Sequence, residues 1–347
     1  MREVISRTGI IDPTFIKEVN NLRAFIISAK KDCDDYERSS PSNTQIIEFI
    51  NNLSDVYIKL DQYFERIWLL VKNLPQESYR HYQIYIQKLL LPYFSTPPLN
   101  SRIYEKPLGY DGDYIMMNYY YNNGYEGKSV FDILMHRYTL NLPIAKATIN
   151  RFKYLYNDIL STFETIGSGT KISSLGCGPA NEIIDFIKAE NVSADIIFNC
   201  IDAEPKAIEE IRNKIQSFVP TTKTNFHINL FNYNILKYIK ISRKDQIINN
   251  QDLIFAGGLF DYLVDKVAQR LIEAMFALLA KNGTIVITNF SKNIPSRAYL
   301  ELIGRWYLIL RNEEDMIKLC SNIYKTAKID IKRDNETKTL LYLTITK

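Results

Sequence analysis

From residue 171 to the end of the chain, short apolar segments alternate with longer amphipathic ones. The apolar segments have the length of strands, and the amphipathic ones repeat their apolar residues at helical spacing. Strands and helices in alternation form a mostly parallel sheet covered by helices. Hydrophobic residues make up 46% of the chain and charged residues 24%, which excludes a disordered, collagenous or fibrous protein. We therefore expect a globular α/β domain here.

The expected elements of this domain end in a hairpin. Strands are expected at 171–175, 196–201, 226–230, 253–256, 284–288, 325–332 and 339–346. Helices are expected at 180–190, 205–218, 264–280, 296–310 and 312–321. A polar turn at Asp334-Asn335 joins the last two strands. The hairpin predicts one antiparallel strand in an otherwise parallel sheet.

Residues 1–100 have the pattern of helices. Ser42 and Gln45 have the spacing of a capping box. Apolar residues then recur at alternating spacings of four and three over 46–71, which predicts one helix of about seven turns. A second helix is expected over 76–91. The apolar face is expected to pack in a helical bundle or against another domain. The alternative is an intermolecular coiled coil, which would make the protein a homo-oligomer through these helices.

Charge, cysteine content and hydropathy limit the partners and the location. The net charge of +4 does not point to nucleic acid or to an anionic membrane. The chain has three histidines and four cysteines, and the cysteines form no Cys-x-x-Cys pair. We therefore expect neither a structural metal site nor a disulfide framework. No apolar run approaches 18 residues, and no signal-peptide pattern opens the sequence. Free thiols without an export signal predict the cytosol.

The segment 173–182, with the sequence SSLGCGPANE, carries the strongest local motif. A strand ends before it and a helix begins within it, so Gly176 and Gly178 lie in a tight β–α turn. Glycine lets the backbone turn sharply and lets a ligand approach without a Cβ in the way. Cys177 between them is expected to be a small turn residue rather than a nucleophile. A plain connecting turn is the alternative.

An acidic residue follows the next strand. Asp202 lies 24 residues after Gly178, within the range in which an acidic residue binds a ribose diol. The alternative is that Asp202 caps the helix that begins at Pro205. The third glycine of the dinucleotide fingerprint is missing, because Asn181 and Glu182 occupy that region, and no phosphate-binding Gly-x-x-x-x-Gly-Lys motif occurs. An adenosyl group without phosphates fits this pattern better than a pyrophosphate does.

These residues resemble a known superfamily. The sequences LGCGP at 175–179 and Ile201-Asp202, with the order of strands and helices, are similar to those of class I S-adenosylmethionine-dependent methyltransferases. The resemblance covers 171–347. It implies a Rossmann-like seven-stranded sheet with one antiparallel strand, S-adenosyl-L-methionine as cofactor, and no metal. With the helical N-terminal part it predicts two domains, a helical lid domain at 1–150 and a cofactor-binding domain at 151–347.

Three stretches resemble more closely the bacterial methyltransferases of 3-hydroxypalmitic acid methyl ester biosynthesis, a pathway of secondary metabolism. They are KPLGYDGDYIMM at 106–117, GLFDYL at 258–263, and Asn289-Phe-Ser with Arg297 downstream. The chain departs from that pattern at Leu108, where the family usually has Arg, and at Asp111, where it usually has a small residue or Pro.

The resemblance and the topology together assign roles, because open α/β sheets bind ligands at the carboxyl ends of their strands. The residues expected to bind the cofactor are Gly176, Cys177, Gly178, Asp202, Ala203, Asn234, Gly257, Gly258 and Leu259. The candidate catalytic residues are Tyr110, Asp113, Tyr114 and Asp261, with a helix cap as the alternative for Asp261. Asn289, Phe290 and Ser291 are expected to line the acceptor side.

The loop at 106–117 is expected to fold over the cofactor as a lid that excludes water. Tyr110, Asp113 and Tyr114 lie within five residues of one another, and aromatic faces and carboxylates stabilise a cation such as the sulfonium. Asp113 could also serve as a base for an amine acceptor. The tyrosines at 119–121 are instead expected to pack between two domains.

The sequence leaves several functions open. The first is methylation of a small molecule, with a fatty-acid carboxylate as the acceptor that the narrower resemblance implies. The second is cyclisation of S-adenosylmethionine to azetidine-2-carboxylate and methylthioadenosine. The third is cofactor binding without catalysis, with the helix over 42–74 as a contact surface. Nucleic-acid methylation is disfavoured, because Gly-Gly-Leu-Phe at 257–260 replaces the Asn/Asp-Pro-Pro-Tyr/Phe motif.

Overall fold

The computed structural model describes residues 11–189, 195–218, 226–240 and 248–347. The chain forms two compact units, and each consists of several stretches. The helical unit comprises the chain up to Asp111, Asn122–Ala145 and Ile294–Tyr307. The sheet unit comprises Gly112–Tyr121, Lys146–Asn293 and Leu308–Lys347. A single domain boundary at residue 150 stays a prediction.

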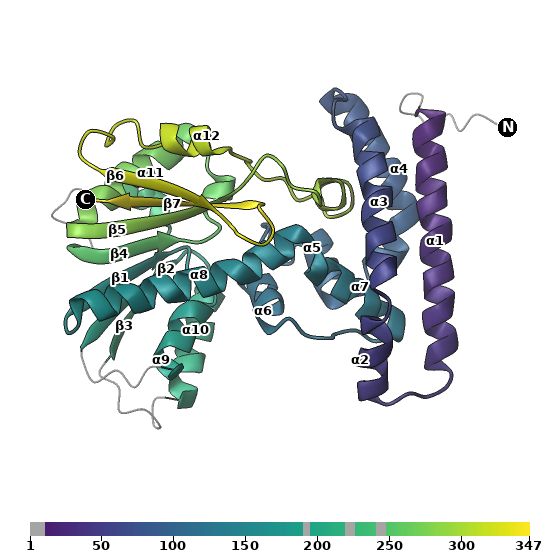
Figure 1. Cartoon of the computed structure of the whole chain (residues 1–347), viewed down its shortest axis with the longest axis horizontal. Coiled ribbons are helices and arrows are strands. Elements are labelled where there is room, and N and C mark those ends of the chain that lie inside the picture. Colours follow the sequence, from purple (N-terminus) through teal and green to yellow (C-terminus); the bar gives the residue numbers. More distant parts are fainter. Residues whose placement is uncertain (1–10, 190–194, 219–225, 241–247) are drawn as a thin grey trace. The chain divides into compact units, whose positions relative to one another are not determined.

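The sheet unit contains seven strands in the order β3-β2-β1-β4-β5-β7-β6 (Figure 1). Their bounds are β1 Thr170–Leu175, β2 Ile196–Asp202, β3 Phe226–Asn232, β4 Gln251–Ala256, β5 Leu279–Phe290, β6 Lys328–Arg333 and β7 Leu340–Thr346. Strand β7 pairs antiparallel with both β5 and β6, whereas the other described pairs are parallel. The predicted α/β fold, a seven-stranded mostly parallel sheet with one antiparallel strand, is confirmed.

Helices cover both faces of this sheet (Figure 1). One hydrophobic core lies under α8 Pro143–Ile166, α9 Asn181–Ala189 and α10 Pro205–Phe218. The opposite core lies under α11 Asp265–Leu278, α12 Glu313–Lys318 and the short helix η2 Ile235–Lys240. Along β4, Leu253 and Phe255 belong to the first core, and Ile254 and Ala256 to the second. This alternation is the side-chain period of a strand buried on both faces.

The remaining helices lie in the N-terminal half. They are α1 Pro13–Glu37, α2 Asn43–Asn51, α3 Ser54–Val71, α4 Gln76–Phe94, α5 Pro98–Glu105, α6 Tyr114–Asn122 and α7 Val130–Asn141. The capping box of Ser42 and Gln45 is present at the start of α2. The single helix predicted over 46–71 is wrong at one point, because α2 ends at Asn51 and α3 begins at Ser54. The two adjacent asparagines at 51–52 are poor helix formers.

The helix predicted at 296–310 is shorter than expected and belongs to the helical unit. Its regular part is the π-helical segment η5 Tyr299–Ile303, which ends at Gly304 with Arg305 in the left-handed conformation. Within the helical unit, the buried ring of Tyr299 packs edge-on against Phe64 and Tyr138. Because of this packing the segment belongs to the helical unit and not to the sheet unit. Periodicity alone could not predict this assignment.

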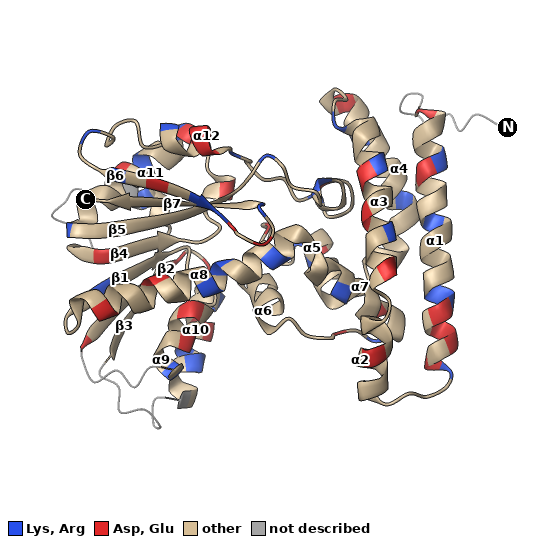
Figure 2. Ribbon diagram, viewed as in Figure 1, with Lys and Arg blue, Asp and Glu red and all other residues tan. Residues whose placement is uncertain are grey.

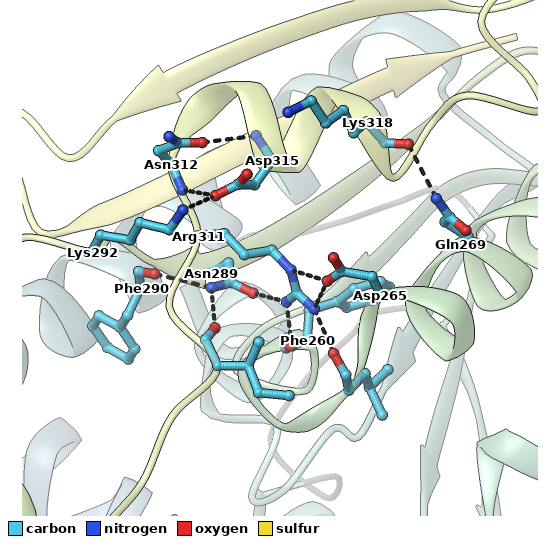
Figure 3. Close-up of polar contacts among 12 residues, drawn as sticks. Phe260, Asp265, Gln269, Asn289, Phe290, Lys292, Arg311, Asn312, Asp315 and Lys318 are labelled. Carbon is cyan, nitrogen blue, oxygen red and sulfur yellow. Dashed lines mark hydrogen bonds and ion pairs between the residues drawn. The ribbon is translucent and has the colours of Figure 1, made fainter. Parts of the chain in front are cut away.

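A buried arginine fixes the chain after β5 (Figure 3). Arg311 is 1% exposed, and its guanidinium donates to the carbonyls of Phe260 and Leu263, to Asn289 Oδ1 at 2.6 Å and to Asp265 at 2.8–3.0 Å. These bonds use all of its donor nitrogens. They join the loop after β4, the end of β5 and the start of α11.

We predict that Arg311→Met lowers the free energy of unfolding by at least about 3 kcal/mol, because the two carbonyls and Asn289 Oδ1 lose their donor inside the protein. Urea unfolding measures this loss. Lys292→Met is the matched control, since it removes an ion pair of Asp315 that is far more exposed, and such pairs contribute about 0–1 kcal/mol. Equal losses in the two variants would contradict the structural role of Arg311.

Candidate functional site

The turn after β1 has the conformation that its glycines allow. Gly176 has φ of +63° and Gly178 φ of +52°, the left-handed region that glycine adopts at little cost. A Cβ added at Gly176 would lie 3.7 Å from the Cβ of Leu259, in the loop after β4. A Cβ added at Gly178 would lie 3.9 Å from the Cβ of Tyr114, with no closer described neighbour. The turn therefore meets both the β4 loop and the start of α6.

The backbone N–H groups of this turn are bonded to the end of β2. Those of Gly176 and Cys177 donate to the carbonyl oxygen of Ile201 at 2.9 and 3.2 Å. That of Gly178 donates to Asp202 Oδ2 at 2.8 Å. Three successive amides thus point at protein acceptors, whereas an anion-binding loop leaves its amides free for the anion.

The second carboxylate oxygen of Asp202 accepts from the N–H of Glu204 at 2.8 Å. Asp202 thus holds two loops together and also shapes the turn before α10. Burial raises the pKa of Asp202, against the opposing effect of the bonds from Glu204 and Gly178. Each carboxylate oxygen has a second lone pair, so the group can still accept hydrogen bonds from a ligand. Asp202 does not cap α10, because Glu204, directly before the helix, accepts from the N–H of Lys206 at 3.1 Å. The ligand-binding hypothesis for Asp202 stays a prediction.

The next two predicted cofactor residues lie after β2 and β3. Ala203 is exposed, and its carbonyl accepts from the side-chain amide of Asn232 at 3.0 Å. The same amide donates to the carbonyl of Asp202 at 3.1 Å. Asn234 is also exposed, and its Oδ1 accepts from the N–H of Leu236 at the start of η2. These residues follow neighbouring strands at the same edge of the sheet.

The predicted lid segment is divided between the two units. Asp113 is buried and caps α6, since its Oδ1 accepts from the N–H groups of Ile115 and Met116 at 3.0 Å. Tyr114 follows and lies beside Gly178, as described above. Tyr110 is 40% exposed and belongs to the helical unit. The glycine turn and Tyr114 thus meet within the sheet unit, and the place of Tyr110 stays a prediction.

Polar contacts hold α6 against the two helices that follow β1 and β2. Asn118 Oδ1 accepts from Asn181 at 3.1 Å and from Lys214 Nζ at 3.2 Å, and its amide donates to Glu210 at 2.6 Å. Lys214 in turn forms an ion pair with Glu210 at 2.6 Å and donates to Asn181 at 2.8 Å. These side chains were not predicted as part of the site, because they come from three separate helices.

The loop after β4 lies against an arginine that sequence analysis missed. A Cβ added at Gly258, which has φ of +89°, would lie 2.8 Å from a terminal nitrogen of Arg151 in α8. Arg151 also donates to Met117 Sδ at 3.4 Å. A sequence signal for it exists, because Arg151 replaces an apolar residue in the helical series Ala147, Leu155 and Ile159.

Two buried carboxyl groups lie in the same part of the unit. Asp261 accepts from the N–H of Phe290 at 2.7 Å, and burial raises its pKa to about 6. Burial raises the pKa of Glu182 to about 7. The charge of Arg151 opposes both shifts. Asp261 does not cap α11, whose cap position is Val264, so this alternative is wrong.

The last residues of β5 are bonded within the protein. The buried amide of Asn289 donates to the carbonyls of Phe290 and Ile309 and accepts from Arg311 (Figure 3). Its polar side-chain atoms are thus engaged within the protein, and a role on the acceptor side stays a prediction. The buried guanidinium of Arg311 needs acceptors from every adjacent loop.

The thiol of Cys177 is buried, and burial raises its pKa well above the ordinary value. Since the thiolate is the reactive form, this environment suits a turn residue and not a nucleophile. In the part of the chain that the structure describes, no group of three His, Cys, Asp or Glu side chains is placed to hold a metal ion. None of the described helices is both long and apolar enough to cross a membrane.

Comparison with known proteins shows the fold. No protein-family model and no curated protein matches the chain. A possible exported protein from Bordetella parapertussis is 15% identical, with a TM-score of 0.55 over 89% of this chain and 98% of that one.

Two weaker likenesses have TM-scores of 0.44 and 0.39. The first is to magnesium protoporphyrin IX methyltransferase (ChlM) of Synechocystis PCC 6803 with bound SAH, 12% identical over 59% of this chain and 86% of that one. The second is to the N-methyltransferase NodS of Bradyrhizobium japonicum WM9 with S-adenosyl-l-homocysteine, 15% identical over 56% of this chain and 86% of that one. At these levels of similarity the activity is not carried over.

We predict that Glu182→Gln stabilises the protein at pH 8 by about 1–3 kcal/mol, and by much less at pH 5. The folded protein binds a proton at Glu182 up to about pH 7, whereas the unfolded chain releases it near pH 4.5. This group therefore costs stability as the pH rises between these values, and glutamine removes the cost. Urea unfolding at several pH values measures the difference. Glu209→Gln, on the exposed face of α10, should leave the profile unchanged, and parallel profiles for Glu182→Gln and the wild type would contradict the prediction.

Proposed function

We propose that the chain is an S-adenosylmethionine-dependent methyltransferase that acts on a small molecule. The observation that carries the proposal is the bonding of the turn after β1. The amides of Gly176, Cys177 and Gly178 already donate to the end of β2, and Pro179 has no N–H. A pyrophosphate would need such donors, whereas an adenosyl group without phosphates does not.

The residues of the site fit this cofactor. A Cβ built at Gly178 would have only Tyr114 within 4 Å among the described residues, which leaves room for a ligand beside this part of the backbone. Asp202, at the end of β2, has lone pairs left for the two ribose hydroxyls. Ala203 would lie beside the adenine and Asn234 near its amino group. The loop at 257–259, in contact with Gly176 through Leu259, would lie along the methionine part.

The cofactor, when bound, supplies a methyl group on a sulfonium that a nucleophile can displace. The protein's task is then alignment of the two reactants and exclusion of water. A fatty-acid-type carboxylate is the proposed acceptor, and it is already ionised at neutral pH, so it needs no base. Tyr110, Tyr114, Asp113 and Asp261 are the proposed residues around the acceptor.

The distribution of charge supports a small acceptor. Acidic and basic residues are interspersed along the described helices of both units, and the view in Figure 2 shows no long basic stripe on them. Nucleic-acid binding uses such a stripe. The proposed location is the cytosol, because all four cysteines are buried free thiols. Association through the N-terminal helices remains a prediction.

One experiment tests the function and separates it from cyclisation. The full chain is incubated with S-adenosylmethionine, with and without 3-hydroxyhexadecanoic acid, and the products are separated by mass. S-adenosylhomocysteine formed only with the acid supports methyl transfer. Methylthioadenosine formed without any acceptor supports cyclisation, for which Glu182, with its pKa near 7, is a suitable base. If neither product forms and calorimetry detects no binding of S-adenosylhomocysteine, the proposal is wrong.

We predict that Gly178→Val lowers the affinity for S-adenosylhomocysteine at least about tenfold, because the new side chain occupies the ligand's volume. Calorimetry measures the affinity. Gly167→Val is the matched control, since Gly167 also has a left-handed conformation and open surroundings but precedes β1 at its other end. Both variants bear similar backbone strain, and equal affinities in the two would count against the assignment.

We predict that Asp202→Ala lowers the same affinity by about 10–150-fold, or roughly 1.5–3 kcal/mol, through loss of the carboxylate–diol bonds. Asp252→Ala serves as control, because Asp252 accepts from the N–H of Lys171 at 2.8 Å near the amino end of β1. Both variants lose a bond to the backbone, but only the first should lose affinity. Reduced stability with unchanged affinity would assign Asp202 a purely structural role.

A further inference from the structure

Arg151 is a buried cation on the core-facing side of a helix. Its side chain is 4% exposed and lies one turn from Ala147 and one turn from Leu155, which both belong to the apolar face of α8. Moving a guanidinium out of water costs several kcal/mol unless hydrogen bonds and a counter-charge compensate. The surroundings of Arg151 should therefore contain acceptors for its five N–H groups.

The described part of the protein provides little of this compensation. Arg151 donates one hydrogen bond, to the thioether sulfur of Met117, which is a weak acceptor. Among the described residues, no carboxylate lies within 4.0 Å of its guanidinium nitrogens. Arg311, which is also deeply buried in the described part of this unit, bonds to four residues and has an aspartate partner. The contrast indicates that the described residues supply no close anion for Arg151.

The guanidinium lies at the candidate site. It occupies the space that a side chain at Gly258 would fill, and its aliphatic part lies 3.5 Å from the Cβ position of Gly257. The next residue, Leu259, lies beside the glycine turn, 3.7 Å from the position that a Cβ at Gly176 would occupy. The two nearby acids, Asp261 and Glu182, bind protons more strongly than usual because they are buried. Both groups still carry negative charge at neutral pH, but neither forms an ion pair with Arg151 within 4.0 Å.

We propose that Arg151 binds a carboxylate of the ligand that occupies the glycine-turn site. The planar fork of a guanidinium matches a carboxylate with two parallel hydrogen bonds. A phosphate is disfavoured, because the adjacent turn amides are already bonded to the protein. This inference rests on the proposed function, which brings two carboxylates to the site: that of the methionine part of the cofactor and that of a fatty-acid acceptor.

The test compares ligands with and without the carboxylate. Calorimetry measures the binding of S-adenosylhomocysteine and of 5′-methylthioadenosine, which lacks the amino-acid part, to the wild type, Arg151→Gln and Arg151→Lys. A second series, at saturating S-adenosylhomocysteine, measures hexadecanoic acid against its methyl ester. Arg151→Lys keeps the charge without the fork and should give an intermediate loss.

Two results support the proposal and identify the source of the carboxylate. A loss of at least about tenfold for S-adenosylhomocysteine in Arg151→Gln, with methylthioadenosine unchanged, assigns Arg151 to the cofactor. An unchanged affinity for S-adenosylhomocysteine, with a lost preference for the acid over the ester, assigns it to the acceptor. Unchanged values in both series, or an equal loss for methylthioadenosine, overturn the proposal. If the wild type binds neither nucleoside, the proposed function fails and this inference fails with it.

Thermal unfolding separates a ligand contact from a structural one. Arg151→Gln gives up few bonds within the protein, so it should melt close to the wild type, whereas Arg311→Gln should melt well below it. Saturating S-adenosylhomocysteine should raise the melting temperature of the wild type more than that of Arg151→Gln if the cofactor supplies the carboxylate. Melting of Arg151→Gln as low as that of Arg311→Gln would make the arginine structural and overturn the proposal.

Discussion

The carboxylate of Asp202 connects the loops at the carboxyl edge of the sheet. It accepts one backbone N–H from the turn after β1 and one from the turn before α10. The carbonyl of the same residue accepts from Asn232, so the end of β3 joins the arrangement. Three adjacent strand ends thus depend on one residue. Such a shared anchor gives a rigid edge, and a rigid edge is what close approach of a ligand to the glycine backbone requires.

Two arginines in the sheet unit illustrate two uses of buried charge. Arg311 is surrounded by acceptors, and its bonds determine how the chain continues after β5 (Figure 3). Arg151 has a sulfur atom, a glycine loop and, 6.0 Å from its guanidinium carbon, the ring centre of Phe152 as neighbours. Since a protein gains no stability from a cation that it leaves unpaired, the second arrangement resembles a preorganised binding site, in which folding bears the cost of desolvation before the ligand arrives.

The sequence predicted the sheet well and the site in part. The order and approximate positions of the strands, the glycine turn and the acidic residue at the end of β2 could be inferred, because each depends on neighbours close in sequence or on the period of two or 3.6 residues. Strand lengths could not, since β5 is twelve residues long where 284–288 was expected. The break between α2 and α3 falls at two asparagines. It was not predicted, because the apolar periodicity continues across them. Arg151 was missed because apolar periodicity identifies the apolar positions of a helix face and not a charged residue that lies among them. The packing of Tyr299 depends on partners more than 150 residues away, which no local pattern encodes.

The chain passes back and forth between the helical and the sheet unit rather than completing one before the other. The passages lie at residues 111–112, 121–122, 145–146, 293–294 and 307–308. During synthesis, the first helices are made early, but the ring of Tyr299 that packs against Phe64 leaves the ribosome only after the strands from β1 to β5. The core of the helical unit therefore lacks the ring of Tyr299 until most of the sheet has been synthesised. Its folding rate in the cell is then tied to translation and to contacts of long sequence separation, and this delay is when the chain is most exposed to aggregation.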